Sequence, residues 1–182
     1  MNDNQIMIAL IVEIENQMNL VGVPDFEVSR KAQPTNQYTG ASTNDPIKTR
    51  VFLYAITNPV SGKSRSYFID GVDPKRADIQ HKSKLIQVSV LHSFDESDVN
   101  ASTPEDMANL VRDLIDSPDC IKNLRDDGVF LQDAGDVRPV FTVNDTDRNE
   151  STPNFDIVLN YASDIVKESE IIDTVAPVVV GV

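Results

Sequence analysis

The sequence predicts an α+β fold in which a mostly antiparallel sheet carries an N-terminal helix and a central helix pair on one side. Apolar residues recur with helical spacing near the N-terminus and mid-chain, and they alternate as in strands elsewhere. This order lacks the regular strand–helix alternation of a doubly wound nucleotide-binding fold. We expect a single domain over residues 1–182, with a long polar loop at 31–46 and a C-terminal extension at 165–182.

The first predicted element is a helix from residue 2 to residue 19. Asn2 and Gln5 have the spacing of a capping box, and Gly22 and Pro24 end the element. Five apolar residues share one helical face, and three more widen it, so the front half is expected to be buried on more than one side. The shared face holds Met7, Leu10, Ile11, Ile14 and Met18, and the widening residues are Ile6, Ile8 and Val12.

Strand patterns dominate the next 70 residues. Residues 25–30 alternate as a short strand, and the β-type segments 51–56 and 66–70 flank a turn-rich stretch at 58–63, which predicts a hairpin. Residues 84–94 predict a long strand with one apolar face and one mixed face. The apolar face holds Ile86, Val88, Val90, His92 and Phe94.

A strong helix start follows at residues 102–105, which read Ser-Thr-Pro-Glu. Apolar residues then recur with helical spacing up to Ile115. Ser117 and Pro118 stop this helix and begin a short second one, which ends at Gly128.

The last third of the chain predicts further strands. Residues 137–143 form one of them, and Pro139 places it at an edge or a bulge because proline cannot donate to a ladder. Residues 154–162 alternate clearly, and residues 170–175 are a weaker candidate.

Charge is distributed unevenly. The formal net charge is −13, but residues 1–90 hold 10 Lys/Arg and 9 Asp/Glu, whereas residues 91–182 hold 6 and 20, a balance of −14. Such acidity argues against a general nucleic-acid binder and against docking on anionic lipid. The acidic half is either a solvated face or a surface that repels a polyanion or meets a basic partner. The longest apolar run, residues 6–12, is too short for a membrane span, and no secretory signal is expected.

Residues 57–64 lie close to a phosphate-binding P-loop, because they end in Gly-Lys-Ser. Thr57 stands where the motif needs glycine, and a strand pattern follows where a helix should begin. A hairpin turn is the favoured interpretation, with a nucleotide site as the alternative.

The remaining candidate groups are weak. Asp145, Asp147 and Asn149 match part of a calcium loop, but Glu150 replaces its glycine, so an acidic turn is favoured. The two histidines, His81 and His92, lack metal-ligand spacing, and Cys120 is expected to be a buried structural thiol beside Leu124. The single cysteine excludes an intramolecular disulfide. We therefore assign no catalytic, cofactor-binding or metal-binding residue.

The order and spacing of elements carry a family resemblance. The strand 85–94 precedes a helix containing Ala-Asn-Leu-Val-Arg-Asp-Leu at 108–114, then Asn-Leu-Arg-Asp-Asp-Gly-Val at 123–129, Asp-Val-Arg-Pro-Val at 136–140 and the strand 154–161. Together with the N-terminal helix and the segments at 51–70, this pattern resembles the neck and tail-terminator proteins of long-tailed bacteriophages over residues 1–165.

The resemblance implies a non-enzymatic structural protein without cofactors. It implies a homo-oligomeric ring, commonly a hexamer, that caps the tail tube and helps join the tail to the head. The implied partners are tube and sheath proteins and head-completion or connector proteins, with no membrane. Viral DNA would pass through without specific binding, and the acidic half would line that channel.

The implied location is the neck or tail of the virion, after assembly in the host cytoplasm. The alternatives are a tail-completion or baseplate adaptor protein of a phage, a small P-loop-like nucleotide binder, and an unrelated acidic binding module.

Overall fold

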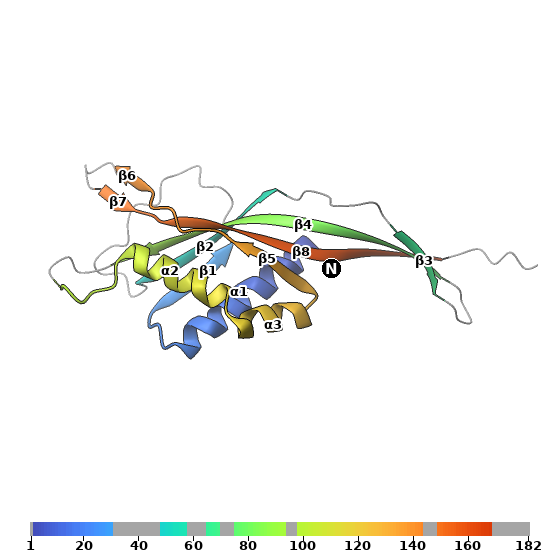
Figure 1. The fold of residues 1–182 in the computed structure, drawn as a ribbon, viewed down its shortest axis with the longest axis horizontal. Coiled ribbons are helices and arrows are strands. Elements are labelled where there is room, and N and C mark those ends of the chain that lie inside the picture. Colours follow the sequence, from blue (N-terminus) through green and yellow to red (C-terminus); the bar gives the residue numbers. More distant parts are fainter. Residues whose placement is uncertain are drawn as a thin grey trace, which may run out of the picture.

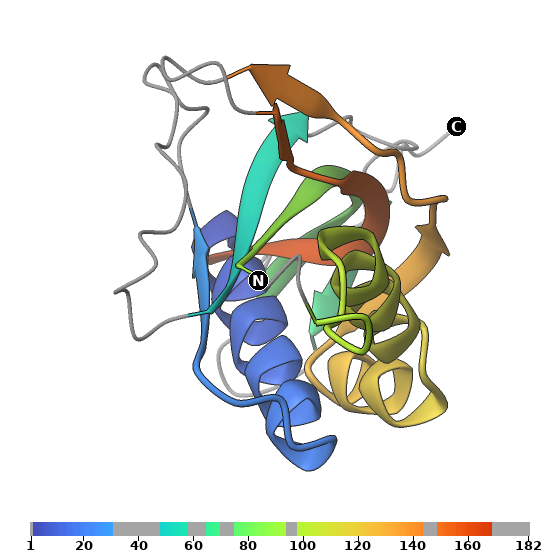
Figure 2. The ribbon, with the colours of Figure 1, turned by 90° about the vertical axis from the view of Figure 1, so that its left-hand side faces the viewer.

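The computed structural model describes residues 2–30, 48–57, 65–69, 75–93, 98–143 and 149–168. Within these residues, three helices cover one face of a six-stranded sheet, and a separate two-stranded sheet lies at one end (Figure 1). Seen along the long axis, the first helix and the central helix pair lie side by side under the same face (Figure 2). The predicted α+β class, with its helices on one side of a mostly antiparallel sheet, is confirmed.

Helix α1 spans Asp3–Leu20 and begins with the predicted capping box between Asn2 and Gln5. The predicted core residues of this helix lie inward, and so does Ile6. Burial on more than one side is wrong for Ile8 and Val12, which are 51% and 47% exposed. The sheet and the other two helices contact α1 from one side, which leaves the opposite side in water.

The main sheet has the strand order β1-β2-β4-β8-β5, with β3 also paired to β4. Strands β1 and β2 are parallel, and the other neighbours are antiparallel. Strand β5 was not predicted from the sequence. The bounds are β1 Phe26–Arg30, β2 Thr49–Thr57, β3 Arg65–Ile69, β4 Lys75–His92, β5 Val129–Ala134 and β8 Asn154–Glu168.

The predicted hairpin between residues 51–56 and 66–70 is wrong. Strands β2 and β3 do not pair with each other, because each pairs with β4: β2 with residues 85–92 and β3 with residues 75–79. Since β8 occupies the other edge of β4, β2 and β3 follow one another along a single edge. Strand β4 begins nine residues before the predicted start at Lys84, and this extra length gives β3 its partner. Residues 58–64 lie outside the described residues.

The central helices match their prediction. Helix α2 spans Pro104–Ile115, with Thr103 as its N-cap, and α3 spans Pro118–Asp126, with Ser117 as its N-cap. Gly128 follows α3 with φ at +78°, a left-handed conformation that favours glycine, and its N–H donates to the carbonyl of Arg125.

The predicted strand at 137–143 exists only in part. Strand β6 spans Phe141–Val143 and pairs with β7, Asn149–Ser151. Before it, Arg138 forms an isolated bridge to Asn154, and Pro139 then removes a donor from any longer ladder. Strand β8 is longer than predicted and includes residues 165–168 of the expected C-terminal extension. The loop at 31–46, the strand candidate at 170–175 and the rest of the extension lie outside the described residues.

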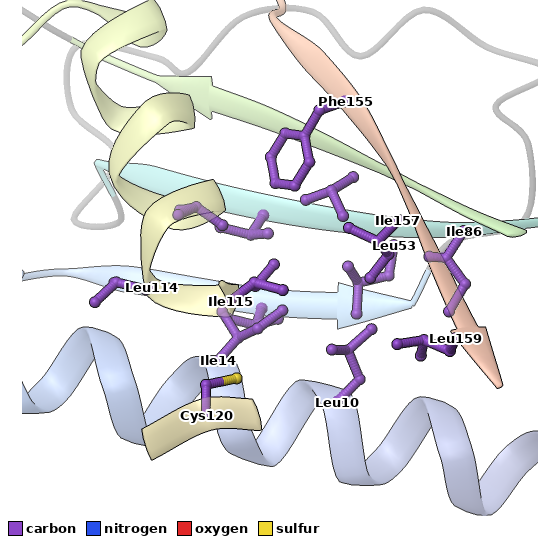
Figure 3. Close-up of a cluster of buried hydrophobic side chains, with 14 of the residues drawn as sticks. Leu10, Ile14, Leu53, Ile86, Leu114, Ile115, Cys120, Phe155, Ile157 and Leu159 are labelled. Carbon is purple, nitrogen blue, oxygen red and sulfur yellow. The ribbon is translucent and has the colours of Figure 1, made fainter. Parts of the chain in front are cut away.

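The core lies between the sheet and the helices (Figure 3). Alternate residues of β4 and β8 point into it, among them Ile86 and Ile157, and they meet Leu10 and Ile14 of α1 and Ile115 of α2. Burial of this apolar surface is the main source of fold stability.

Candidate functional site: a β-arm beyond the helices

The register of the sheet leaves part of it projecting beyond the helices. Strands β4 and β8 pair without interruption from Lys75↔Glu168 to Ser89↔Asn154. Strand β2 pairs with β4 only from Leu85 onward, and β5 pairs with β8 only up to Tyr161. We call the remaining part the β-arm: β3, residues 75–83 of β4 and residues 162–168 of β8. It extends about 25 Å at the usual strand rise, is narrow, and carries none of the described helices (Figure 1).

The two faces of the β-arm are fixed by the alternation of the core. Ile86 and Ile157 are register partners that point toward the helices, so even-numbered residues of β4 and odd-numbered residues of β8 continue that face into the β-arm. We call it the inner face. It carries Ile165, which is 57% exposed, whereas Val166 lies on the outer face and is 54% exposed.

A polar network joins β3 to β4 on the inner face. The Ser66 hydroxyl donates to Oδ1 of Asp78 at 2.6 Å, and Nε of Arg76 donates to the same oxygen at 3.0 Å. Arg76 Nη2 also donates to the Ser66 hydroxyl at 2.9 Å. The Arg76 side chain is about half exposed, so this ion pair orients the strands more than it stabilises them.

The described side chains of the β-arm bury little apolar surface. Tyr67, Ala77 and Val166 are register neighbours on the outer face, but only the small Ala77 is buried, while Tyr67 is 45% exposed. Strand ribbons gain stability when one face packs on another layer. Exposed apolar residues on both faces therefore make the β-arm a candidate contact surface.

A buried charged group holds the base of the β-arm to α1. The Nζ of Lys84 lies 3.2 Å from Oδ2 of Asp3, and the Tyr161 hydroxyl donates to Asp3 Oδ1 at 2.8 Å. Burial and, secondarily, this carboxylate raise the pKa of Tyr161 to about 12. The β-arm therefore starts from a fixed position relative to the helices.

The β-arm differs in charge from the rest of the chain. Its residues include five Lys/Arg and three Asp/Glu, a balance of +2, which leaves −15 for the remainder of the −13 total. By contrast, α2, α3 and their C-caps expose a row of carboxylates. These are Asp106, Asp113, Asp116, Asp119, Asp126 and Asp127.

The histidines and the cysteine singled out from the sequence do not form a chemical group. His81 and His92 lie on one strand, eleven residues and about 36 Å apart along it. His92 Nδ1 lies 2.9 Å from the Thr49 hydroxyl, and burial followed by Lys48 lowers the pKa of this imidazole. Cys120 is fully buried on α3, as expected, and burial followed by Glu13 raises its pKa to about 12.

The other candidate sites from the sequence lie largely outside the described residues. Residues 58–64 of the P-loop-like segment and residues 144–148 of the acidic turn lie outside the described ranges. Among the residues that the structure places, no group of three or more His, Cys, Asp or Glu side chains could hold a metal ion. In the same part of the chain, no helix is long and apolar enough to cross a membrane.

The β-arm could not be predicted from the sequence, for a physical reason. Residues 75–83 and 163–168 have few apolar residues because both of their faces meet solvent, so the two-residue periodicity of a half-buried strand is weak. In residues 75–83, the pair Ala77 and Ile79 was the only indication of a strand. In residues 163–168, the indication was the adjacent apolar residues Ile165 and Val166.

One family model, described as E217 gateway protein gp29, matches residues 5–171 of the chain. This match covers α1 from its third residue onward, the whole main sheet and both central helices. No curated protein is significantly similar to the chain.

Proposed function

Because this chain belongs to the E217 gateway protein gp29 family, which places it among phage structural proteins of the head–tail junction, we propose that it is a ring-forming subunit of the neck. In this role it caps the tail tube as a tail terminator and helps join the tail to the head. The observation that carries the proposal is the family match over residues 5–171, which leaves only short ends unmatched.

The shape of the subunit supports assembly into a ring. A ring needs a contact between two different surfaces that is repeated by a closing rotation. The β-arm and the helical layer are two such surfaces, at different places on an elongated subunit (Figure 1). We propose six copies, with tube and sheath proteins on one side of the ring and head-completion or connector proteins on the other.

The acidic half of the chain supports a second part of the proposal. DNA leaving the head passes through the centre of a neck ring, and a lining of carboxylates would limit adhesion of phosphates by like-charge repulsion. Residues 91–182 hold 6 Lys/Arg and 20 Asp/Glu, a balance of −14. We propose that acids from this half line the channel, so that DNA passes without specific binding. A ring with a neutral or basic bore would contradict this placement.

Electron microscopy of the phage particle that contains the chain tests the main proposal. Density for a ring of this fold between the portal and the first tube ring is the expected result. Location at the baseplate would instead support an adaptor at that end, and absence from the particle would contradict both. Labelling through a C-terminal tag and imaging of tails detached from heads provides an independent measurement of the same position.

A further inference from the structure

Among the residues that the structure describes, none covers the inner face of the β-arm, whereas helices cover the same face elsewhere in the sheet. In the body of the sheet, α1, α2 and α3 lie over this face, but the helices stop where the β-arm begins (Figure 1). Ile165 is more than half exposed there and is the register partner of Asp78, whose other partner is Ser66. A layer supplied from outside would remove Ile165 from water.

The charge of the β-arm indicates what kind of helical layer fits. Arg76 and Lys82 are the basic residues that β4 contributes to the inner face, and Arg76 stays about half exposed beside Asp78. A positive surface is complemented by an acidic one, which steers association and fixes orientation. The outer surface of α2 and α3 carries six exposed aspartates against two exposed basic residues, Lys122 and Arg125, and no large exposed apolar residue among its described positions.

We propose that the inner face of the β-arm packs against the outer, acidic surface of α2 and α3 in a second copy of this chain. Ile165 is the apolar anchor of this contact, and Arg76 and Lys82 face the aspartates of the neighbour. The inference rests on the proposed ring and names the contact that builds it.

This contact is heterologous and leaves the channel lining intact. Each copy offers one β-arm and receives another on a different surface, so the contact repeats from copy to copy and closes when the rotation closes. It uses exposed aspartates of α2, α3 and their C-caps. The other acids of residues 91–182 remain for the channel.

Substitutions at two adjacent exposed positions test the assigned face. In the purified full-length chain, Ile165→Glu removes the anchor and places a negative charge against the acidic surface. We expect it to weaken self-association by about tenfold or more in sedimentation equilibrium, and Ile165→Lys to weaken it less. Val166→Glu is the matched control, because Val166 is exposed to a similar extent on the opposite face. It should change the self-association constant by less than about twofold. The contact would be overturned if Ile165→Glu and Val166→Glu weakened self-association equally, or if Ile165→Glu did not weaken it. It would also be overturned if the chain stayed monomeric at every concentration.

Cysteine pairing between copies tests the receiving surface. The inner-face variant Ser163→Cys is mixed with Asp119→Cys on α3 and oxidised, and we expect a disulfide-linked dimer in high yield. Leu20→Cys at the end of α1 is the control, because Leu20 is 77% exposed but lies outside the proposed contact. The native Cys120 is fully buried and stays out of the reaction. Preferential pairing of Ser163→Cys with Leu20→Cys would contradict the assignment.

The two proposals fail separately. A neck ring whose copies meet through other surfaces would contradict the β-arm contact and leave the proposed function standing. Copies that pair β-arm to helices, in a protein located away from the head–tail junction, would contradict the function and leave the contact standing.

Discussion

Lys84 is almost completely buried on β4, and its Nζ lies 3.2 Å from Oδ2 of Asp3 in the first turn of α1. The lysine belongs to the strand that continues into the β-arm, and the aspartate belongs to the helix that covers the core. Placing an ammonium group there requires a close carboxylate, because an isolated buried charge is very unfavourable. The pair therefore ties the helical layer to the base of the β-arm.

Removal of the Asp3 charge should destabilise the fold. Asp3→Asn keeps an acceptor for Tyr161 but leaves the Lys84 ammonium buried without its counter-charge. We expect a loss of about 2 kcal/mol in the free energy of unfolding, below the range for fully buried pairs because the Asp3 side chain is partly exposed. Urea denaturation measures it. Lys84→Met should cost less, and Asp113→Asn, at an exposed ion pair with Arg112, should stay within about 0.5 kcal/mol. An Asp3→Asn protein as stable as wild type would show that the pair contributes nothing.

Stability should decline at high pH through Tyr161. Its pKa rises from 10.0 to about 12 in the folded state, so the protonated phenol is favoured by folding. The associated stabilisation is complete below pH 10 and is lost as the pH rises from 10 toward 12. Cys120 shifts in the same direction, from 9.0 to about 12, so its contribution starts to fall near pH 9. Unfolding free energies of wild type and Tyr161→Phe between pH 8 and pH 11.5 should converge above pH 10. A constant difference across that range would refute this assignment.

The side chain of Thr103 should stabilise α2, whereas the side chain of its neighbour Ser102 should not. The Thr103 hydroxyl accepts from the backbone N–H of Asp106, which satisfies one of the free donors of the first turn. Thr103→Ala should therefore cost about 1 kcal/mol of unfolding free energy. Ser102→Ala is the matched control, since Ser102 is exposed and lies outside the cap. Thermal unfolding of both variants measures the difference, and similar losses would place the cap elsewhere.

Cys120 should react with thiol reagents only after unfolding. It is fully buried on α3, and burial together with Glu13 raises its pKa to about 12, so the native protein has almost no thiolate at pH 8. Alkylation by iodoacetamide, followed by mass spectrometry, should be slow in buffer and complete in 8 M urea. Leu20→Cys, at a 77% exposed site, supplies the rapid reference rate. Fast labelling of native Cys120 would indicate that α3 opens readily.

The local elements with complete sequence signals were predicted from the sequence. Asn2 and Gln5 mark the start of α1, Thr103 and Pro104 mark α2, and Gly128 marks the end of α3. The alternation of Phe155, Ile157 and Leu159 identified the buried face of β8. These signals depend on residues close together in the chain, so one sequence contains them in full.

Which strands pair with each other could not be predicted from such local signals. The turn residues at 58–63 suggested that residues 51–56 and 66–70 pair with each other, but both strands pair with β4. The pairing partner of β2 and β3 depends on the length of β4, and the first nine residues of β4 lack an apolar face. The exposure of Ile8 and Val12 likewise depends on where α2 and α3 pack against α1.

By itself, the sequence determined the helices and their caps, the buried faces of the strands, the α+β class and the uneven charge, because short-range periodicity and composition encode them. Only the tertiary structure decided that β4 and β8 continue past the helices as a β-arm and that Lys84 meets Asp3. Both depend on the pairing of segments far apart in the chain, where the energy of each contact comes from a partner that the local sequence does not specify.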